Sequence, residues 1–243
     1  MTRATVVLLH GVGLDHTVWG PVQALLPDTI ETVTPDLAGH GSNPPAQEGV
    51  LLADLAEGVV AAIPPGSHLV GFSLGALVAQ HIAVHRPELV ASLTSVSSVC
   101  KRTADERAAV LSRLDVAATD FAASAEASLQ RWYDGTDVSP EQVRLTRATL
   151  LANDPDSFLN CYRVFATADA DIADDLPRIT VPALAITGEH DPGSTPEMTR
   201  RLAESIPHCR AVVVPRARHM LPVERPRELV DHLSAFIGEN AHV

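Results

Sequence analysis

Short apolar runs alternate with segments of helical spacing along most of the chain. The runs are rich in Val, Leu, Ile and Ala and have the length of about four to eight residues that is typical of buried strands. The segments between them place apolar residues three or four positions apart, as amphipathic helices do. Strands that alternate with helices predict a parallel sheet covered by helices. We expect strands near 5–9, 30–34, 67–71, 90–96, 183–187 and 211–214, and helices near 19–26, 51–63, 73–86, 196–205 and 226–236.

This alternation stops between residues 100 and 176. Helical spacing and many charged residues replace the strand-like runs there, for example over 104–114 and 140–151. We expect residues 1–99 and 177–243 to form one α/β core, and residues 100–176 to form an inserted helical lid. Such a lid excludes water from a site and selects substrates. The alternative is a purely structural layer of helices.

Composition and charge limit the size of the core and the kinds of partner that the protein can bind. The chain has 243 residues, 46% of them hydrophobic, which is enough for one sizeable core. Its net charge is −12, and this acidic balance argues against binding to nucleic acid or to an anionic membrane surface. We expect a small-molecule substrate as the partner and a monomer or homodimer as the assembly.

The cysteines and the lengths of the hydrophobic runs indicate the cellular compartment in which the protein works. Three widely spaced cysteines do not suggest a disulfide framework and favour a reducing cytosol. The apolar run at the N-terminus is too short for a signal peptide, and no stretch has the length that crosses a bilayer. We therefore expect a cytoplasmic protein without a membrane partner.

A serine stands between two glycines in the pentapeptide Gly-Phe-Ser-Leu-Gly at 71–75. An apolar run precedes it and a helical pattern over 76–85 follows, so the context predicts a strand, a sharp turn and a helix with Ser73 at the apex. Small neighbours allow a turn this sharp, and the helix start presents free N–H groups to developing negative charge. The pattern predicts a nucleophile elbow; the alternative is a glycine-rich turn with an incidental serine.

A second glycine turn follows the first apolar run, as Gly11-Val12-Gly13. A buried strand can aim a backbone N–H from such a turn at the site near Ser73. We expect the N–H groups of Val12 and Leu74 to form the oxyanion hole. A nucleotide-binding loop is excluded because the third glycine of a dinucleotide fingerprint and the lysine of a P-loop are missing. His10 is expected to brace this turn.

Two later loops supply an acid and a base. Asp191 lies just past the run at 183–187, and His219 follows the run at 211–214. The carboxyl ends of parallel strands are where open sheets build their sites. The chain order Ser73, Asp191, His219 is that of hydrolases with this elbow. Glu189 is the rival acid, and the alternative roles are a turn residue and a surface histidine.

These motifs together resemble the α/β-hydrolase superfamily over essentially the whole chain. The resemblance implies a mostly parallel sheet with flanking helices and a lid. The antiparallel hairpin that often precedes the first strand has no room here, so we expect about six strands. Asp36 and His40 are expected to hold their own loop by hydrogen bonds. The segments that carry the resemblance are 9–11, 35–42, 71–75, 188–191 and 218–220.

Two subgroups of that superfamily are the most similar. Residues 11–19 resemble small carboxylesterases that act on pimeloyl esters, and parts of 131–192 resemble 3-oxoadipate enol-lactonases. In the enol-lactonases a basic lid residue beside a tryptophan faces a substrate carboxylate, which implies that Arg131 and Trp132 bind substrate. The alternative is a solvated arginine face with Trp132 as a core anchor; Arg144, Arg147 and Arg163 also lie in the lid.

The sequence thus predicts a serine hydrolase without a metal or organic cofactor. We expect it to form an acyl-enzyme and to hydrolyse a small, carboxylate-bearing ester or enol-lactone. Three alternatives stay open: a general short-chain carboxylesterase, a lyase or hydrolase of C–C or amide bonds on the same triad, and a non-catalytic ligand receptor.

Overall fold

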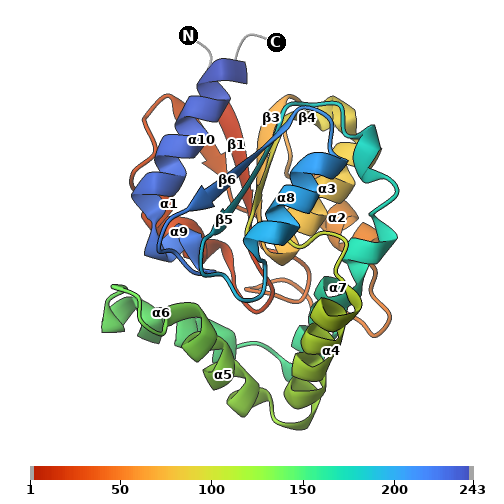
Figure 1. Ribbon diagram of the computed structural model, residues 1–243, viewed down its shortest axis with the longest axis vertical. Coiled ribbons are helices and arrows are strands. Elements are labelled where there is room, and N and C mark those ends of the chain that lie inside the picture. The colour runs from red at the N-terminus through yellow and green to blue at the C-terminus, as the bar shows by residue number, and fades with distance from the viewer. Residues whose placement is uncertain (1–2, 241–243) are drawn as a thin grey trace.

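A computed structural model describes residues 3–240 and shows a parallel sheet between two layers of helices (Figure 1). The strand order is β2-β1-β3-β4-β5-β6, and every neighbouring pair is parallel. The predicted fold and all six predicted strand positions are confirmed. The strands are β1 (Ala4–Leu9), β2 (Ile30–Val33), β3 (Ser67–Phe72), β4 (Val90–Val96), β5 (Ala183–Gly188) and β6 (Cys209–Val214).

The central strands are the most buried part of the sheet. Every residue of β3 and β5 is buried, as expected for parallel strands that are covered on both faces. In register, Leu9 of β1 lies beside Gly71 of β3, and Gly71 lies beside Ser95 of β4. This alignment brings the carboxyl ends of the three strands to one edge.

Helices on each face bury a separate apolar core. On one face lie α2 (Leu52–Val60), α3 (Leu74–His85) and α8 (Pro196–Ser205), and on the other lie α1 (Gly20–Gln23), α9 (Leu221–Glu224) and α10 (Pro226–Asn240) (Figure 1). The first core includes Leu77 and Leu202. The second includes Trp19 and Leu233.

The helix predicted over 19–26 is shorter than expected. A 3-10 helix, η1 (His16–Trp19), leads into the single turn α1, and the chain leaves the helix at Ala24. Ala24 and Leu25 continue only as turns, and Pro27 restricts the dihedrals of Leu26 alone. The other 3-10 helices are η2 (Pro87–Leu89) and η3 (Leu176–Arg178).

Four helices between β4 and β5 lie across the carboxyl edge of the sheet (Figure 1). Helices over 104–114 and 140–151 were expected, and both are confirmed within longer elements. Each helix starts at a side-chain cap, respectively Thr103, Asp120, Ser139 and Asp154. We call these helices the lid segment: α4 (Ala104–Thr119), α5 (Phe121–Tyr133), α6 (Pro140–Leu151) and α7 (Pro155–Asp171).

A buried ion cluster ties the two ends of the lid segment together. The Arg102 guanidinium lies 2.8 Å from Asp169 Oδ1, and Arg107 lies 3.1 Å from the same oxygen. The Arg102 backbone N–H donates to Asp169 Oδ2 at 2.8 Å. Both charges of the first pair are almost fully buried, so removal of one partner would leave an uncompensated charge.

Within residues 3–240, no helix combines the length and the apolar character that crossing a membrane requires.

Candidate active site

Ser73 occupies the sharp turn between β3 and α3. Its backbone is left-handed, with φ 54° and ψ −113°, a conformation that costs free energy and is found at functional sites. A Cβ at Gly71 would overlap the Gly75 carbonyl, and one at Gly75 would overlap the Leu9 carbonyl. Glycine is therefore required at both positions, and the close packing holds Ser73 at the end of the strand.

Asp191 and His219 meet because the loops after β5 and β6 are bonded to each other. The His190 N–H donates to the Ala217 carbonyl at 2.8 Å. A Cβ at Gly188 would overlap the carbonyls of Ala217 and Arg218. The close approach of these two loops brings the two side chains to the same point of the sheet edge.

His219 is oriented by Asp191. The Nδ1–H of His219 donates to Asp191 Oδ2 at 2.7 Å, while Asp191 Oδ1 accepts the N–H groups of Gly193 and Ser194, both at 2.9 Å. The proton on Nδ1 leaves the Nε2 lone pair free to act as a base. The rival acid, Glu189, is half-exposed and instead accepts the Arg216 N–H at 2.8 Å.

Ser73, Asp191 and His219 line one cleft between the sheet edge and the lid segment. The space between the atoms of the cleft amounts to about 570 Å³, a volume that includes open solvent at its mouth. Val12 also lines it, on the side of the first glycine turn. The lid segment contributes Arg113, Ser128, Arg131, Trp132, Leu150, Phe158, Tyr162 and Phe165.

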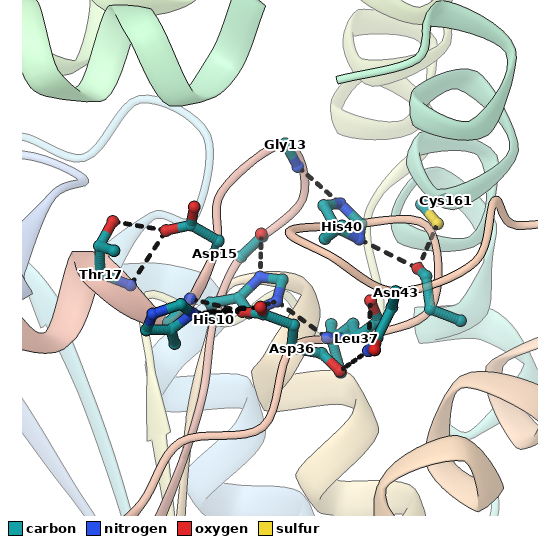
Figure 2. Close-up of polar contacts among 12 residues, drawn as sticks. His10, Gly13, Asp15, Thr17, Asp36, Leu37, His40, Asn43 and Cys161 are labelled. Atoms are coloured by element: carbon teal, nitrogen blue, oxygen red, sulfur yellow. Dashed lines mark hydrogen bonds and ion pairs between the residues drawn. The ribbon is translucent and has the colours of Figure 1, made fainter. Parts of the chain in front are cut away.

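The peptide group between Gly11 and Val12 is held by His10. His10 is fully buried, and its Nδ1–H donates to the Gly11 carbonyl at 2.8 Å. The carbonyl and N–H of one trans peptide point in opposite directions, so the bond to the Gly11 carbonyl fixes the direction of the Val12 N–H. The Leu37 N–H donates to His10 Nε2 at 2.9 Å (Figure 2). Burial lowers the pKa of His10 to about 4, and the ring is neutral at pH 7.

The backbone N–H and carbonyl of Gly13, the last residue of the turn, are each held by a side chain from another segment. The Gly13 N–H donates to His40 Nε2 at 2.8 Å (Figure 2). Asn153, just after α6, donates from Nδ2 to the Gly13 carbonyl at 2.9 Å. Burial is the main cause that lowers the pKa of His40 to about 3. The predicted bracing by His10 is confirmed as a contact, and His40 reaches beyond its own loop to the glycine turn.

Asp36 binds the segment that follows this turn. Its Oδ1 accepts the backbone N–H of His16 at 2.7 Å and lies 3.0 Å from His16 Nδ1. His40, in turn, donates from Nδ1 to the Ala38 carbonyl at 3.1 Å. The prediction that His40 holds its own loop by a hydrogen bond is confirmed. For Asp36 it is wrong in the partner, because the Asp36 carboxylate bonds His16 of the preceding segment.

Arg131 and Trp132 both reach the cleft from the end of α5. Arg131 donates to the Ala127 carbonyl at 3.1 Å and to Ser128 Oγ at 2.8 Å. Trp132 stacks on His219, with ring centroids 5.8 Å apart and planes inclined by 23°. The other lid arginines that the sequence singled out lie away from the cleft: Arg144 pairs with Glu141, Arg147 pairs with Glu126, and Arg163 is exposed.

Two residues of the site were not predicted from the sequence. Arg113, on α4, lines the cleft, and Asn153 bonds the Gly13 turn. Neither belongs to a local motif, since Arg113 is one of several arginines in a charged helix and Asn153 follows a helix end. Only the packing of the lid segment brings them to the site.

Sequence comparison places the chain among known hydrolases. A model of the alpha/beta hydrolase family matches residues 6–232. A pimeloyl-[acyl-carrier protein] methyl ester esterase of Aeromonas hydrophila is 31% identical over 241 residues, covering 96% of this chain and 94% of that protein. An (E)-2-((N-methylformamido)methylene)succinate hydrolase of Acinetobacter baylyi is 29% identical over 235 residues, covering 95% and 89%.

Solved structures with the same fold cover nearly the whole chain. The enol-lactonase from Burkholderia xenovorans LB400 superposes with a TM-score of 0.87 at 24% identity, covering 98% of this chain and 92% of that one. A thermophilic esterase from Thermogutta terrifontis, with malate bound, gives a TM-score of 0.84 at 24% identity, covering 98% and 90%.

Proposed function

The chain belongs to the alpha/beta hydrolase family, and we propose that it is a serine hydrolase in which Ser73, His219 and Asp191 form the catalytic triad. It is an enzyme that acts on ester bonds, in keeping with its esterase relatives. The observation that carries the triad proposal is the convergence of the three side chains on one cleft, with His219 bonded to Asp191.

In the first half of the reaction, Ser73 Oγ attacks the carbonyl carbon of the substrate. His219 Nε2 takes the proton of the hydroxyl and passes it to the leaving oxygen, so that an acyl-enzyme and a free alcohol or enol form. Asp191 holds the imidazole in the required tautomer and stabilises its charged form. In the second half, water activated by His219 hydrolyses the acyl-enzyme.

The oxyanion of each tetrahedral intermediate is bound by the N–H groups of Val12 and Leu74. Leu74 is the first residue of α3, and the N–H groups of a helix's first turn have no partner within the helix. The Val12 N–H belongs to the peptide that His10 orients. Because both donors are fixed before the substrate arrives, they stabilise the developing charge without reorganisation.

The substrate is a small ester or enol-lactone that carries a carboxylate, and residues 100–176 act as a lid that selects it. Arg131 supports this substrate class, because its guanidinium lines the cleft and a planar guanidinium binds carboxylates through two parallel hydrogen bonds. The name of one relative also supports it, since that protein is a hydrolase of a succinate derivative.

Covalent labelling tests the nucleophile. A fluorophosphonate probe should modify Ser73, and Ser73→Ala should abolish both labelling and ester turnover, by roughly 10⁴-fold or more. The matched control is Ser112→Ala, a change at an exposed position of α4, which should label and turn over normally. Labelling at another serine, or repeated turnover in the Ser73 variant, would remove the proposed role of Ser73.

A further inference from the structure

We infer that Arg113 and Arg131 form a two-cation site in the cleft and that the substrate carries two free carboxylates in addition to the ester that Ser73 would attack, with one carboxylate bound by each guanidinium. The inference rests on the proposed function, because it describes the substrate whose ester Ser73 would attack. It adds Arg113 as a specificity-determining residue and a second anionic group on the substrate.

The first observation is how the arginines of the lid region are paired. Arg102 and Arg107 bind Asp169, Arg144 pairs with Glu141, and Arg147 pairs with Glu126. Arg163 is exposed and bonds to Asn160. Arg113 and Arg131 differ from all of these. Within residues 3–240 no carboxylate lies within 4.0 Å of either guanidinium, although both line the cleft.

The second observation is the charge balance of the cleft itself. Among the described residues that line it, Asp191 is the only carboxylate. Its two oxygens accept hydrogen bonds from His219, Gly193 and Ser194, and neither oxygen lies within 4.0 Å of the nitrogens of Arg113 or Arg131. The chain has 30 acidic residues against 18 basic ones, yet none of the described acids neutralises these two arginines.

The two cations also act on each other. Burial lowers the pKa of Arg131; the interaction with Tyr162 raises this pKa, and the positive charge of Arg113 contributes a smaller lowering. Two like charges that are held near one another in a half-buried cleft are unfavourable unless an anion lies between them or at each of them. A ligand with two negative groups removes that cost, which ties the stability of the arrangement to ligand binding.

The donors and the walls of the cleft indicate which anion fits. Arg131 is fixed by two hydrogen bonds within its own helix. Arg113 lines the cleft and forms no side-chain hydrogen bond to another described residue, which leaves its N–H donors available to a ligand. The guanidinium groups come from different helices, α4 and α5. The other lid walls are apolar or aromatic: Trp132, Leu150, Phe158, Tyr162 and Phe165. Two guanidinium groups on separate helices, in a cleft with apolar walls, match two carboxylates joined by a short hydrocarbon. They match a single compact dianion such as phosphate less well.

Binding to the Ser73→Ala protein tests the inference without any turnover. Calorimetric titrations would compare malonate, succinate, glutarate and adipate, each with the unbranched monocarboxylate of the same chain length, in a low-salt buffer free of carboxylates. At least one diacid should bind about tenfold or more tightly than its monoacid partner, the scale of one hydrogen bond to a charged group. Inorganic phosphate should bind more weakly than that diacid.

Variants then assign each carboxylate to its arginine. Arg113→Gln should lower diacid affinity about tenfold and leave monoacid affinity almost unchanged, so that the preference for the diacid disappears. Arg113→Lys should retain part of it, because an ammonium keeps the charge and loses the planar fork. Arg131→Gln should weaken both classes of ligand. Arg163→Gln, the matched change at an exposed lid arginine, should alter neither, and thermal unfolding checks that every variant is folded.

Equal binding of every diacid and its monoacid would overturn the two-cation site. Equal losses for both ligand classes in Arg113→Gln would also overturn it, since they would show a general electrostatic effect. Phosphate that bound more tightly than all the diacids would replace the dicarboxylate by a compact dianion. None of these binding outcomes requires substrate turnover. The proposed role of Ser73 is tested separately, by the labelling experiment.

Discussion

The indole of Trp132 lies almost parallel to the imidazole of His219, with 23° between the planes and 5.8 Å between the ring centroids. On another side of the imidazole lies Phe72, with ring centroids 5.1 Å apart. The ring proposed to carry the proton is therefore packed against one residue of the sheet and one of the lid segment. The lid segment therefore contacts one member of the proposed triad directly, through Trp132.

Trp132→Ala should lower kcat/KM for every ester by about 2- to 10-fold, the range expected from an aromatic pair worth about 0.5–1.5 kcal/mol. Trp132→Phe should keep most of the activity because an aromatic ring still covers the imidazole. Steady-state kinetics on one neutral and one acidic ester would measure this. A loss confined to the acidic ester would mean that Trp132 acts on the substrate and not on His219.

Asp191→Asn should lower kcat by roughly 10⁴-fold while the protein stays folded. The Asp191 Oδ1 accepts two backbone N–H groups, so an asparagine would keep its oxygen there and turn its NH₂ toward His219. The imidazole would then carry its proton on Nε2, the wrong nitrogen for a base. Glu189→Gln is the control and should change kcat little. The opposite pair of results would make Glu189 the acid.

Asn153→Ala should lower kcat by about 2- to 10-fold with little change in KM, since it removes a hydrogen bond to the Gly13 carbonyl and loosens the proposed oxyanion turn. The matched control is Asn160→Ala. Asn160 also reaches from the lid segment to a core loop, but it donates to the Ala46 carbonyl at 3.0 Å. Equal losses in both variants would indicate general docking of the lid and not an effect on the turn.

His10 and His40 should make the protein less stable in acid. Their pKa values fall from 6.5 to about 4 and about 3, mainly because of burial. Between those values and about 6.5 the unfolded chain binds protons that the folded protein does not, so the free energy of unfolding falls as the pH is lowered. Each histidine contributes about 1.4 kcal/mol per pH unit within that window, and the full stability is present above it.

Urea unfolding between pH 7 and pH 4.5 would measure this dependence. His40→Gln should be less stable at pH 7 and should show a shallower fall in stability, because one of the two buried rings is gone. His232→Gln, at an exposed position of α10, should keep the slope of the original protein. Identical slopes in all three proteins would show that other groups control the acid sensitivity.

The sequence alone was sufficient for the sheet and for the candidate nucleophile, because both follow from local physics. Apolar runs of strand length mark β1 to β6, and the Gly-x-Ser-x-Gly pattern supplies the small residues that a sharp turn at Ser73 requires. The positions of Asp191 and His219 could also be predicted, since the loops that follow parallel strands share one edge of the sheet. The predicted helix ended at residue 26, just before Pro27, whereas α1 ends three residues earlier, at Gln23.

Only the tertiary structure decided which side chains meet at that edge. Asp191 and Glu189 stand two residues apart in one loop. The hydrogen bonds that Asp191 accepts from Gly193 and Ser194 hold its side chain toward His219, whereas the side chain of Glu189 is about half exposed. Arg113 belongs to a charged helix whose own pattern marks no functional face. The packing of α4 against α5 places Arg113 at the cleft. Such contacts join residues that are far apart in the chain, so neither segment shows them in its own sequence pattern.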